Sequence, residues 1–378
     1  MRSSLLPIAA LACAVVISAC GSSGSSNGGN GSSSGGGSGG SSSGASSSGA
    51  SSSGGSGGSG SSSGSVLPDA AVDGDVTPMD SGTGGLSYTV QFGPITVNPG
   101  VDNTQCIVVN LNNPTTLKIG QIHDLLGNAS HHMILYKLAA GTPLQPTPFD
   151  CQPFQDTLNP AMGSPLVISQ RKDDLVTLPP GVAFSLDPNQ IVRLEMHYIN
   201  ANTVAQTLVT TSTLYPIDPS TYKADAAFLF IGDINISIPP GATFSTGQQY
   251  FAMPAQYDTS NFFAITGHEH HLGTNVKVWS ASSSSDPGTQ IYQSQSWSDP
   301  PTTQFAPPLR TTAGGGFKYQ CDWDNTTNAT VTFGEHATDE MCFFWAYYWP
   351  SQGVSVCFNA NGGSLCCPQA GAAICSQL

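Results

Sequence analysis

The chain has 378 residues, of which 10 are Lys or Arg and 24 are Asp or Glu, and its formal net charge is −14 at pH 7. This length exceeds that of one ordinary domain. So few cations leave no basic face for a phosphate backbone or for anionic lipid headgroups, which argues against nucleic acid as a partner and against binding to an anionic membrane surface.

Residues 1–19 have the pattern of a lipoprotein signal peptide. Arg2 precedes an apolar run from Leu5 to Val16, and small residues lead into Cys20. The run is too short to span a bilayer, and the residues before Cys20 resemble a bacterial lipobox, after which the cysteine is acylated. We therefore expect an exported bacterial lipoprotein, held in the outer membrane by the lipid alone, on the periplasmic or the cell-surface face. A conventional export signal with a chance cysteine is the alternative.

A long segment of low complexity follows Cys20. From Gly21 to Ser65, 41 of 45 residues are Gly or Ser. Such a composition cannot form a packed core, and a Gly/Ser coil of this length has an r.m.s. span of roughly 35–40 Å. We predict that residues 20–85 form a disordered tether that holds the folded part of the chain away from the membrane.

The remaining sequence has the pattern of β-structure. Short runs such as Met133–Tyr136, Ile191–Tyr198 and Asn275–Trp279 are rich in β-branched and aromatic residues and are bounded by Pro, Gly or Asn. No stretch sustains a helical apolar period over a full helix length. We predict an all-β fold with two tandem antiparallel jelly-roll-like β-sandwich domains. The expected limits are 86–215 for the N-terminal domain, 216–355 for the C-terminal domain and 356–378 for a Cys-rich tail.

Five of the eight histidines fall into two tight groups. His268 and His270 form an H-x-H pair, and alternate residues of a strand project from one face, so both imidazoles can reach one metal ion. His131 and His132 are adjacent and would point in opposite directions on a regular strand, so a shared ion requires an irregularity such as a β-bulge. His197 lies in a third apolar strand. Taken singly, each histidine is more often a hydrogen-bonded structural residue than a ligand.

Four motifs that occur in a fixed order favour metal ligands over structural histidines. They are Ala-Ser-His-His-Met-Ile-Leu-Tyr at 129–136, Leu-Glu-Met-His-Tyr at 194–198, His-Glu-His-His-Leu-Gly at 268–273 and Asp-Glu-Met-Cys at 339–342. Together they resemble the copper type II, ascorbate-dependent monooxygenases, the family of peptidylglycine alpha-hydroxylating monooxygenase and dopamine beta-hydroxylase. The resemblance implies two copper ions per chain, one on each domain, facing each other across an open, solvent-filled cleft.

The resemblance also implies the ligands of each ion. His131, His132 and His197 would hold the electron-transfer copper. His268, His270 and Met341 would hold the copper that meets dioxygen and would be the catalytic residues. Imidazole serves both oxidation states of copper, whereas a soft thioether favours Cu(I). Met341 alone would be interpreted as a core residue.

The cysteines of the mature chain other than Cys20 are even in number, which in an exported protein indicates disulfides. A metal site at the C-terminal cysteines is the alternative, but adjacent Cys366 and Cys367 lack zinc-ligand spacing. The resemblance implies the pairs Cys106–Cys151 and Cys321–Cys342. It leaves open the pairing of the last four cysteines, which are Cys357, Cys366, Cys367 and Cys375.

The resemblance implies hydroxylation of a C–H bond in a small organic substrate, with O₂ and ascorbate or an equivalent reductant as co-substrates. Peptide amidation is not expected, because Thr266, Phe343 and Trp345 replace an arginine, an asparagine and a tyrosine of the amidating branch. Phe343, Trp345 and Trp349 suggest an apolar or aromatic substrate, unless they are core residues. The alternative function is a non-catalytic surface lipoprotein that binds or stores copper. The sequence does not define the substrate, the physiological donor or the oligomeric state.

Overall fold

The computed structural model describes residues 78–81, 85–153, 163–334, 336, 338–360 and 363–367. These residues form β-strands and two short 3-10 helices, with no α-helix among them. The all-β prediction is therefore confirmed. No helix in this part of the chain has the length and apolar character needed to cross a membrane. The predicted signal peptide, Cys20, most of the tether and Cys375 lie outside the described residues.

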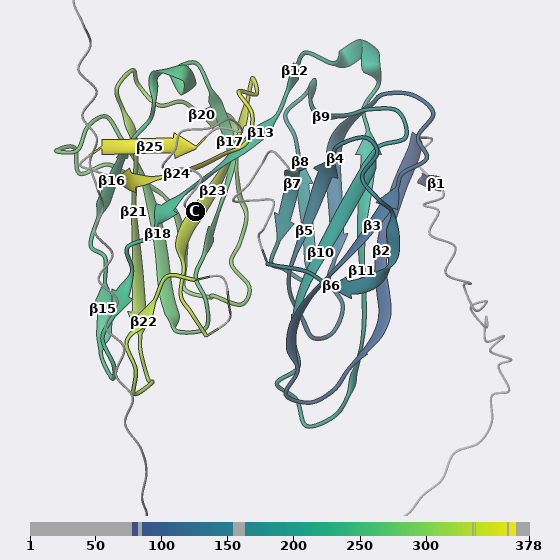
Figure 1. The fold of residues 1–378 in the computed structure, drawn as a ribbon. Helices are drawn as coiled ribbons and strands as arrows, with labels where there is room; N and C mark the ends of the chain where they lie inside the picture. The colour runs from purple at the N-terminus through teal and green to yellow at the C-terminus, as the bar shows by residue number, and fades with distance from the viewer. Residues whose placement is uncertain are drawn as a thin grey trace, which may run out of the picture. The chain divides into compact units, whose positions relative to one another are not determined.

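The N-terminal strands form two sheets (Figure 1). One has the order β6-β3-β10-β5-β7, and the other has the order β1-β2-β11-β4-β9-β12, with β8 paired to β4. The strands are β1 (Pro78–Ser81), β2 (Gly85–Val97), β3 (Asp102–Asn110), β4 (Leu117–Leu125), β5 (Ser130–Leu138), β6 (Gln145–Asp150), β7 (Gly163–Ser169), β8 (Asp173–Thr177), β9 (Val182–Leu186), β10 (Ile191–Ile199), β11 (Gln206–Pro216) and β12 (Ala224–Asp225).

The C-terminal strands form two larger sheets and a short two-stranded one (Figure 1). Their orders are β20-β17-β23-β13-β24-β25, β15-β21-β18-β19 with β16 on β21, and β14-β22. The 3-10 helices are η1 (Pro219–Thr221) and η2 (Ala255–Tyr257). The strands are β13 (Ala227–Asp233), β14 (Ser237–Ile238), β15 (Thr243–Ser245), β16 (Gln249–Ala252), β17 (Asn261–His268), β18 (Gly273–Ala281), β19 (Thr289–Ser294), β20 (Thr303–Leu309), β21 (Gly316–Asp324), β22 (Val331–Thr332), β23 (Cys342–Trp349), β24 (Ser355–Ala360) and β25 (Gly363–Cys367).

Strand β23 is buried on both faces, which explains its unbroken apolar sequence. Phe344 and Ala346 pack into a core made by the C-terminal sheets. The alternate residues Trp345 and Tyr347 pack into a second core, which also contains N-terminal residues such as Met133 of β5. The apolar faces of the N-terminal and C-terminal sheets are therefore joined in one hydrophobic cluster.

The change from N-terminal to C-terminal sheets falls between Asp225, where β12 ends, and Ala227, where β13 begins. Two predicted segments are more ordered than the composition indicates. Residues 78–81, which we assigned to the tether, pair with β2 as strand β1. Residues 355–360 and 363–367, most of which we assigned to a separate tail, form β24 and β25, and β24 pairs parallel with β13.

Three disulfides have both of their cysteines among the described residues. Cys106 is bonded to Cys151 and Cys321 to Cys342, which are the pairs that the resemblance implies. A third bond joins Cys357 to Cys366 and closes the β24-β25 hairpin, and Cys367 is also disulfide-bonded. The sequence could not supply this third pairing, because several pairings of the last four cysteines were equally compatible with their spacing.

Two carboxyl groups are buried together in the N-terminal half. Asp124 of β4 lies opposite Asp174 of β8, and the two residues are 0% and 4% exposed. Ser169 Oγ donates a hydrogen bond to Oδ2 of Asp124 at 2.5 Å. Burial raises the pKa of Asp124 to about 7 and that of Asp174 to about 6. The folded protein therefore binds protons here that the unfolded chain releases near pH 4.

Candidate metal centre

His131 and His132 lie on β5, beside the strand β10 that carries His197. In this strand pair His197 lies opposite His132, whereas Tyr198 lies opposite Ser130, so His131 is an extra residue in the register. This is the β-bulge that two adjacent ligands require. The bulge lets both neighbouring imidazoles approach His197.

The three imidazoles, which we call the three-histidine site, lie close enough to share one ion. One nitrogen from each ring lies within 4.8 Å of the other two. Nδ1 of His197 is 3.2 Å from Nε2 of His132. Two imidazole nitrogens at tetrahedral positions, each about 2 Å from one ion, would be about 3.3 Å apart. The spacing of His132 and His197 therefore fits a shared metal ion.

Asp102 orients His197. Nε2 of His197 donates a hydrogen bond to Oδ1 of Asp102 at 2.8 Å, because a carboxylate can only accept. This hydrogen bond is the main reason that the pKa of Asp102 is lowered. The interaction leaves Nδ1 of His197 to face the other two histidines. A carboxylate on the far nitrogen of a ligand imidazole is a common way to fix its tautomer.

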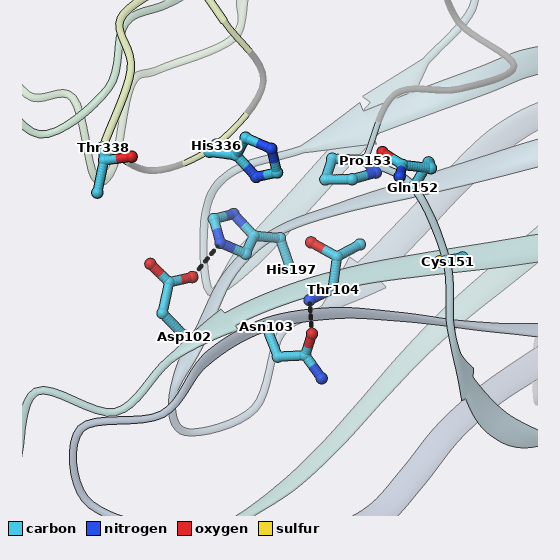
Figure 2. Close-up of a pocket in the computed structure, with 9 residues that line it drawn as sticks. All are labelled: Asp102, Asn103, Thr104, Cys151, Gln152, Pro153, His197, His336 and Thr338. Atoms are coloured by element: carbon cyan, nitrogen blue, oxygen red, sulfur yellow. Dashed lines mark hydrogen bonds and ion pairs between the residues drawn. The ribbon is translucent and has the colours of Figure 1, made fainter. Parts of the chain in front are cut away.

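A cavity of about 380 Å³ opens beside the three-histidine site. Figure 2 shows the imidazole of His197 between Asp102 and the side chain of His336, which the sequence left without a role. Amide and hydroxyl groups make up much of the remaining wall. A small polar molecule in this cavity would contact the ring of His197. The lining residues are Asp102, Asn103, Thr104, Cys151, Gln152, Pro153, His197, His336 and Thr338.

The loop before the bulge is held by Lys172. Its Nζ donates hydrogen bonds to the carbonyl oxygens of Gly127 and Ser130 at 2.7 and 3.1 Å. Ala129 has a φ of 63°, in the left-handed region that non-glycine residues rarely adopt. The carbonyl of Ala129 accepts from the backbone N–H of Ile199 at 2.8 Å. These contacts keep the strained turn in place and so position His131 and His132.

His268, His270 and Met341 are the predicted ligands of the second ion, and we call these three residues the methionine site. His268 ends β17, and its Nδ1 is 2.6 Å from Oε1 of Gln170. Nδ1 of His270 donates to the backbone oxygen of Asp339 at 3.0 Å. Because both Nδ1 atoms are engaged, each ring presents Nε2 for a metal ion.

Met341 reaches the same face through the strand register. His268 lies opposite Phe343 on β23, so these two side chains project from one face of the sheet. Met341 is two residues before Phe343 and is 5% exposed. Cys342 faces the other way and is bonded to Cys321. The alternation places the thioether on the histidine side and the disulfide on the other.

Glu340 joins the two segments of the methionine site. Its Oε2 accepts from the backbone N–H of His270 at 2.9 Å and from the indole N–H of Trp323 at 3.0 Å. Its Oε1 accepts from the backbone N–H of Leu272 at 2.8 Å. Burial raises the pKa of Glu340, and these hydrogen bonds oppose the rise. The loop after β17 and the segment before β23 are thus tied to one carboxyl group.

All six predicted ligands are buried, and burial favours the neutral form of four of the imidazoles. It lowers the pKa of His131 to about 3 and that of His270 to about 4, and it lowers the pKa values of His132 and His268 well below the usual range. A neutral imidazole has a lone pair available for a metal ion. A ligand set of five imidazoles and one thioether fits copper better than a hard, oxygen-preferring cation.

The expectation of an open, solvent-filled cleft between the two sites is not met. The ring centroids of His132 and His268 are 5.8 Å apart. Trp297 lies edge-on to His131 with centroids 5.2 Å apart, and Arg171 pairs with Asp299 at 3.4 Å. The physical reason is the hydrophobic cluster that the N-terminal and C-terminal sheets share, which brings the two ligand sets together.

The other residues that the sequence singled out lie in the hydrophobic core or at positions in contact with solvent. Phe343 and Trp345 are 4% and 0% exposed and belong to the core, so they do not support an aromatic substrate. His123 pairs with Asp173 at 2.8 Å, and His271 is exposed. The sequence did not point to Asp102 or Gln170, because no local motif links them to the histidines they contact. Glu340 could have been found, since it lies inside the Asp-Glu-Met-Cys motif.

A family model matches the part of the chain that carries the methionine site. Residues 224–365 match the family model of the copper type II ascorbate-dependent monooxygenase C-terminal domain. Tyramine beta-hydroxylase of Caenorhabditis briggsae is 29% identical over 198 residues, which cover 47% of this chain and 32% of that protein. The chain thus matches about a third of the length of this relative.

Solved structures give only weak likenesses. The major capsid protein P2 of bacteriophage PM2 has a TM-score of 0.30 and 9% identity, over 71% of this chain and 99% of that one. PNGase F of Flavobacterium meningosepticum has a TM-score of 0.29 and 12% identity, over 70% and 97%. Such scores carry no argument about function. Residues 224–365, which contain His268, His270 and Met341, are therefore similar to the C-terminal domain of the copper type II ascorbate-dependent monooxygenases.

Proposed function

We propose that the protein is a copper-dependent monooxygenase that hydroxylates a C–H bond of a small organic substrate. One atom of O₂ would enter the product and the other would become water, with two electrons from ascorbate or a similar donor. The observation that carries the proposal is the pairing of a buried three-histidine site with a second site of two histidines and a methionine. A protein that only stores copper needs one good site and no thioether beside it.

His131, His132 and His197 would hold one copper ion, and His268 and His270 with Met341 the other. Bound copper would supply one-electron transfer and the activation of dioxygen, which side chains alone cannot provide. Asp102 holds His197 in one tautomer. Most of the surface of these six side chains is buried, which limits the access of water to bound copper and so limits side reactions of reduced oxygen.

The cavity beside His197 supports a route for the electron donor. Asp102, Thr104 and His336 offer a carboxylate, a hydroxyl and an imidazole to a small hydroxylated molecule (Figure 2). A donor bound there would touch the ring of His197, so an electron would have to cross only one imidazole to reach the three-histidine site. We place ascorbate, or a donor of similar size and polarity, in this cavity.

For the substrate, we propose a small aromatic amine. The name of the tyramine beta-hydroxylase relative supports this class. The net charge of −14 is also favourable, because an acidic protein attracts a cationic amine and repels an acid of the same shape.

We further propose that the protein is exported and anchored by a lipid on Cys20, as its N-terminal sequence indicates. The disulfides support an oxidising compartment, because such bonds rarely persist in a reducing cytosol.

Isotope labelling tests the proposed reaction. Copper-loaded protein supplied with ascorbate, ¹⁸O₂ and tyramine should form a product carrying one ¹⁸O atom, with one ascorbate oxidised per product. The anionic analogue 4-hydroxyphenylacetate should react at least about tenfold more slowly. Met341→Ile should abolish incorporation, because it removes the thioether ligand. His123→Ala should not, because His123 lies at the surface and pairs only with Asp173 among the contacts described.

The opposite result would favour the copper-binding alternative. If ascorbate reduces both coppers but no ¹⁸O enters tyramine or any other phenethylamine in a panel, the enzyme proposal fails. Equal incorporation by wild type and Met341→Ile would also contradict it, because the methionine site would then have no part in the reaction.

A further inference from the structure

A residue of the N-terminal half contacts a ligand of the methionine site. Gln170 directly follows β7, and its Oε1 is 2.6 Å from Nδ1 of His268 at the end of β17. Both side chains are buried, with exposed fractions of 4% for Gln170 and 1% for His268. The contact therefore lies inside the protein, where a hydrogen bond cannot be exchanged for water at low cost.

The second hydrogen bond of the amide fixes its direction. Nε2 of Gln170 donates to the backbone oxygen of Gly267 at 3.0 Å. A carbonyl oxygen can only accept, so the NH₂ group must face Gly267 and the amide oxygen must face His268. Nδ1 of His268 must then carry the proton that this oxygen accepts. Nε2 of His268 is then the unprotonated ring nitrogen, whose lone pair can bind a metal ion.

His270 also has its proton on Nδ1, but the group that accepts this proton in a hydrogen bond is different. Its Nδ1 donates to the backbone oxygen of Asp339, which belongs to the same C-terminal half. His268 instead depends on a side chain from the other half of the protein. Two further contacts join the segment around Gln170 to the C-terminal half. Tyr347 Oη accepts from the backbone N–H of Ile168 at 3.3 Å, and the adjacent Arg171 pairs with Asp299 at 3.4 Å.

We propose that Gln170 is a positioning residue that fixes the tautomer and ring orientation of His268 and so presents Nε2 to the copper of the methionine site. The inference rests on the proposed function for the identity of the metal. The orientation of His268, a predicted ligand in the C-terminal half, would then depend on how the N-terminal half packs against the C-terminal half. Contact between the two halves and affinity for copper at the methionine site are then linked.

Two substitutions separate the hydrogen bond from the shape of the side chain. Gln170→Met keeps the length and burial but removes the acceptor, whereas Gln170→Glu keeps an acceptor for Nδ1–H. In the copper-free full chain, ¹⁵N chemical shifts of the His268 imidazole should show the Nδ1–H tautomer in wild type and Gln170→Glu. Gln170→Met should give a mixture of tautomers. Loss of a partner of this kind lowers metal affinity by about 10- to 100-fold, so Cu(I) affinity at the methionine site should fall by that factor in Gln170→Met and by only a few-fold in Gln170→Glu.

Gln190→Met is the matched control. Gln190 is also 4% exposed, and its amide donates to the backbone oxygens of Leu138 and Ile191, near the end of β10 opposite to His197. This variant should lose stability without changing the His268 tautomer or the Cu(I) affinity. If Gln190→Met lowers the affinity as much as Gln170→Met does, the effect is a general consequence of lost stability and the proposal is wrong.

An unchanged tautomer and unchanged Cu(I) affinity in Gln170→Met would also overturn the proposal. This failure is distinguishable from a failure of the proposed function, because the tautomer is measured without copper, oxygen or substrate. If wild type binds no copper at the methionine site, the proposed function fails, and the ¹⁵N shifts still decide whether Gln170 sets the tautomer.

Discussion

Replacement of Glu340 by leucine is expected to remove copper from the methionine site and to lower the free energy of unfolding by about 3–5 kcal/mol. The carboxyl group accepts from the backbone N–H groups of His270 and Leu272 and from the indole of Trp323, and it is 0% exposed. Leucine would leave these donors buried without an acceptor, at about 1–3 kcal/mol for each. The loop that carries His270 would then move away from Met341. Denaturant unfolding and copper analysis measure the two effects.

A milder substitution of Glu340 and a control substitution in the same loop test whether the effect comes from the lost hydrogen-bond acceptors. Glu340→Gln keeps one acceptor oxygen and should lie between wild type and Glu340→Leu in stability. Glu269→Gln is the control, because Glu269 is in the same loop and 2% exposed, and burial raises its pKa well above the usual range. Glutamine resembles the protonated acid, so this variant should keep both coppers. The account of the loop is wrong if Glu340→Leu retains wild-type stability and two coppers.

Asp124→Asn should make the protein less sensitive to rising pH. The pKa of Asp124 is raised to about 7 in the folded state, against 3.8 in an unperturbed carboxyl group. The folded state therefore holds a proton that the unfolded state has lost between about pH 4 and 7, and stability falls as the pH rises through that window. Between pH 5 and pH 8, wild type should lose about 2–3 kcal/mol relative to the asparagine variant.

Urea unfolding of both proteins at pH 5 and pH 8 measures this difference. Titrations of other groups are shared by the two proteins and cancel in the comparison. Asp174, opposite Asp124, shifts in the same direction, so the variant should retain a smaller loss from that group. Asp187→Asn is the control, because the side chain of Asp187 is 76% exposed. A stability difference that stays constant between pH 5 and pH 8 would show that Asp124 is ionised in the folded protein throughout.

Sequence reasoning named the candidate ligands but not the groups that contact them. Spacing alone required an irregular backbone at His131 and His132, and the bulge opposite His197 is present. The alternation that separates Met341 from Cys342 also follows from the period of a strand. These are local properties of the chain, and for that reason the sequence contains them.

Contacts between segments that are distant along the chain could not be predicted from the sequence. Gln170 meets His268 across 98 positions, and Asp102 meets His197 across 95. Neither contact leaves a local pattern, because a single polar residue at a strand end is compatible with many surroundings. The closeness of His132 and His268 has the same origin, since it depends on how complete apolar faces pack. The third disulfide was undetermined because spacing does not choose among four neighbouring cysteines.

Copper stoichiometry tests the central claim most directly. The full chain, loaded with Cu(II) and freed of excess metal, should contain two coppers per protein. His131→Ala should lose the copper of the three-histidine site alone, and Met341→Ile should lose or weaken only that of the methionine site. One copper or none in wild type, with the two variants unchanged, would contradict a paired copper centre and leave the histidines as structural residues of a β-protein.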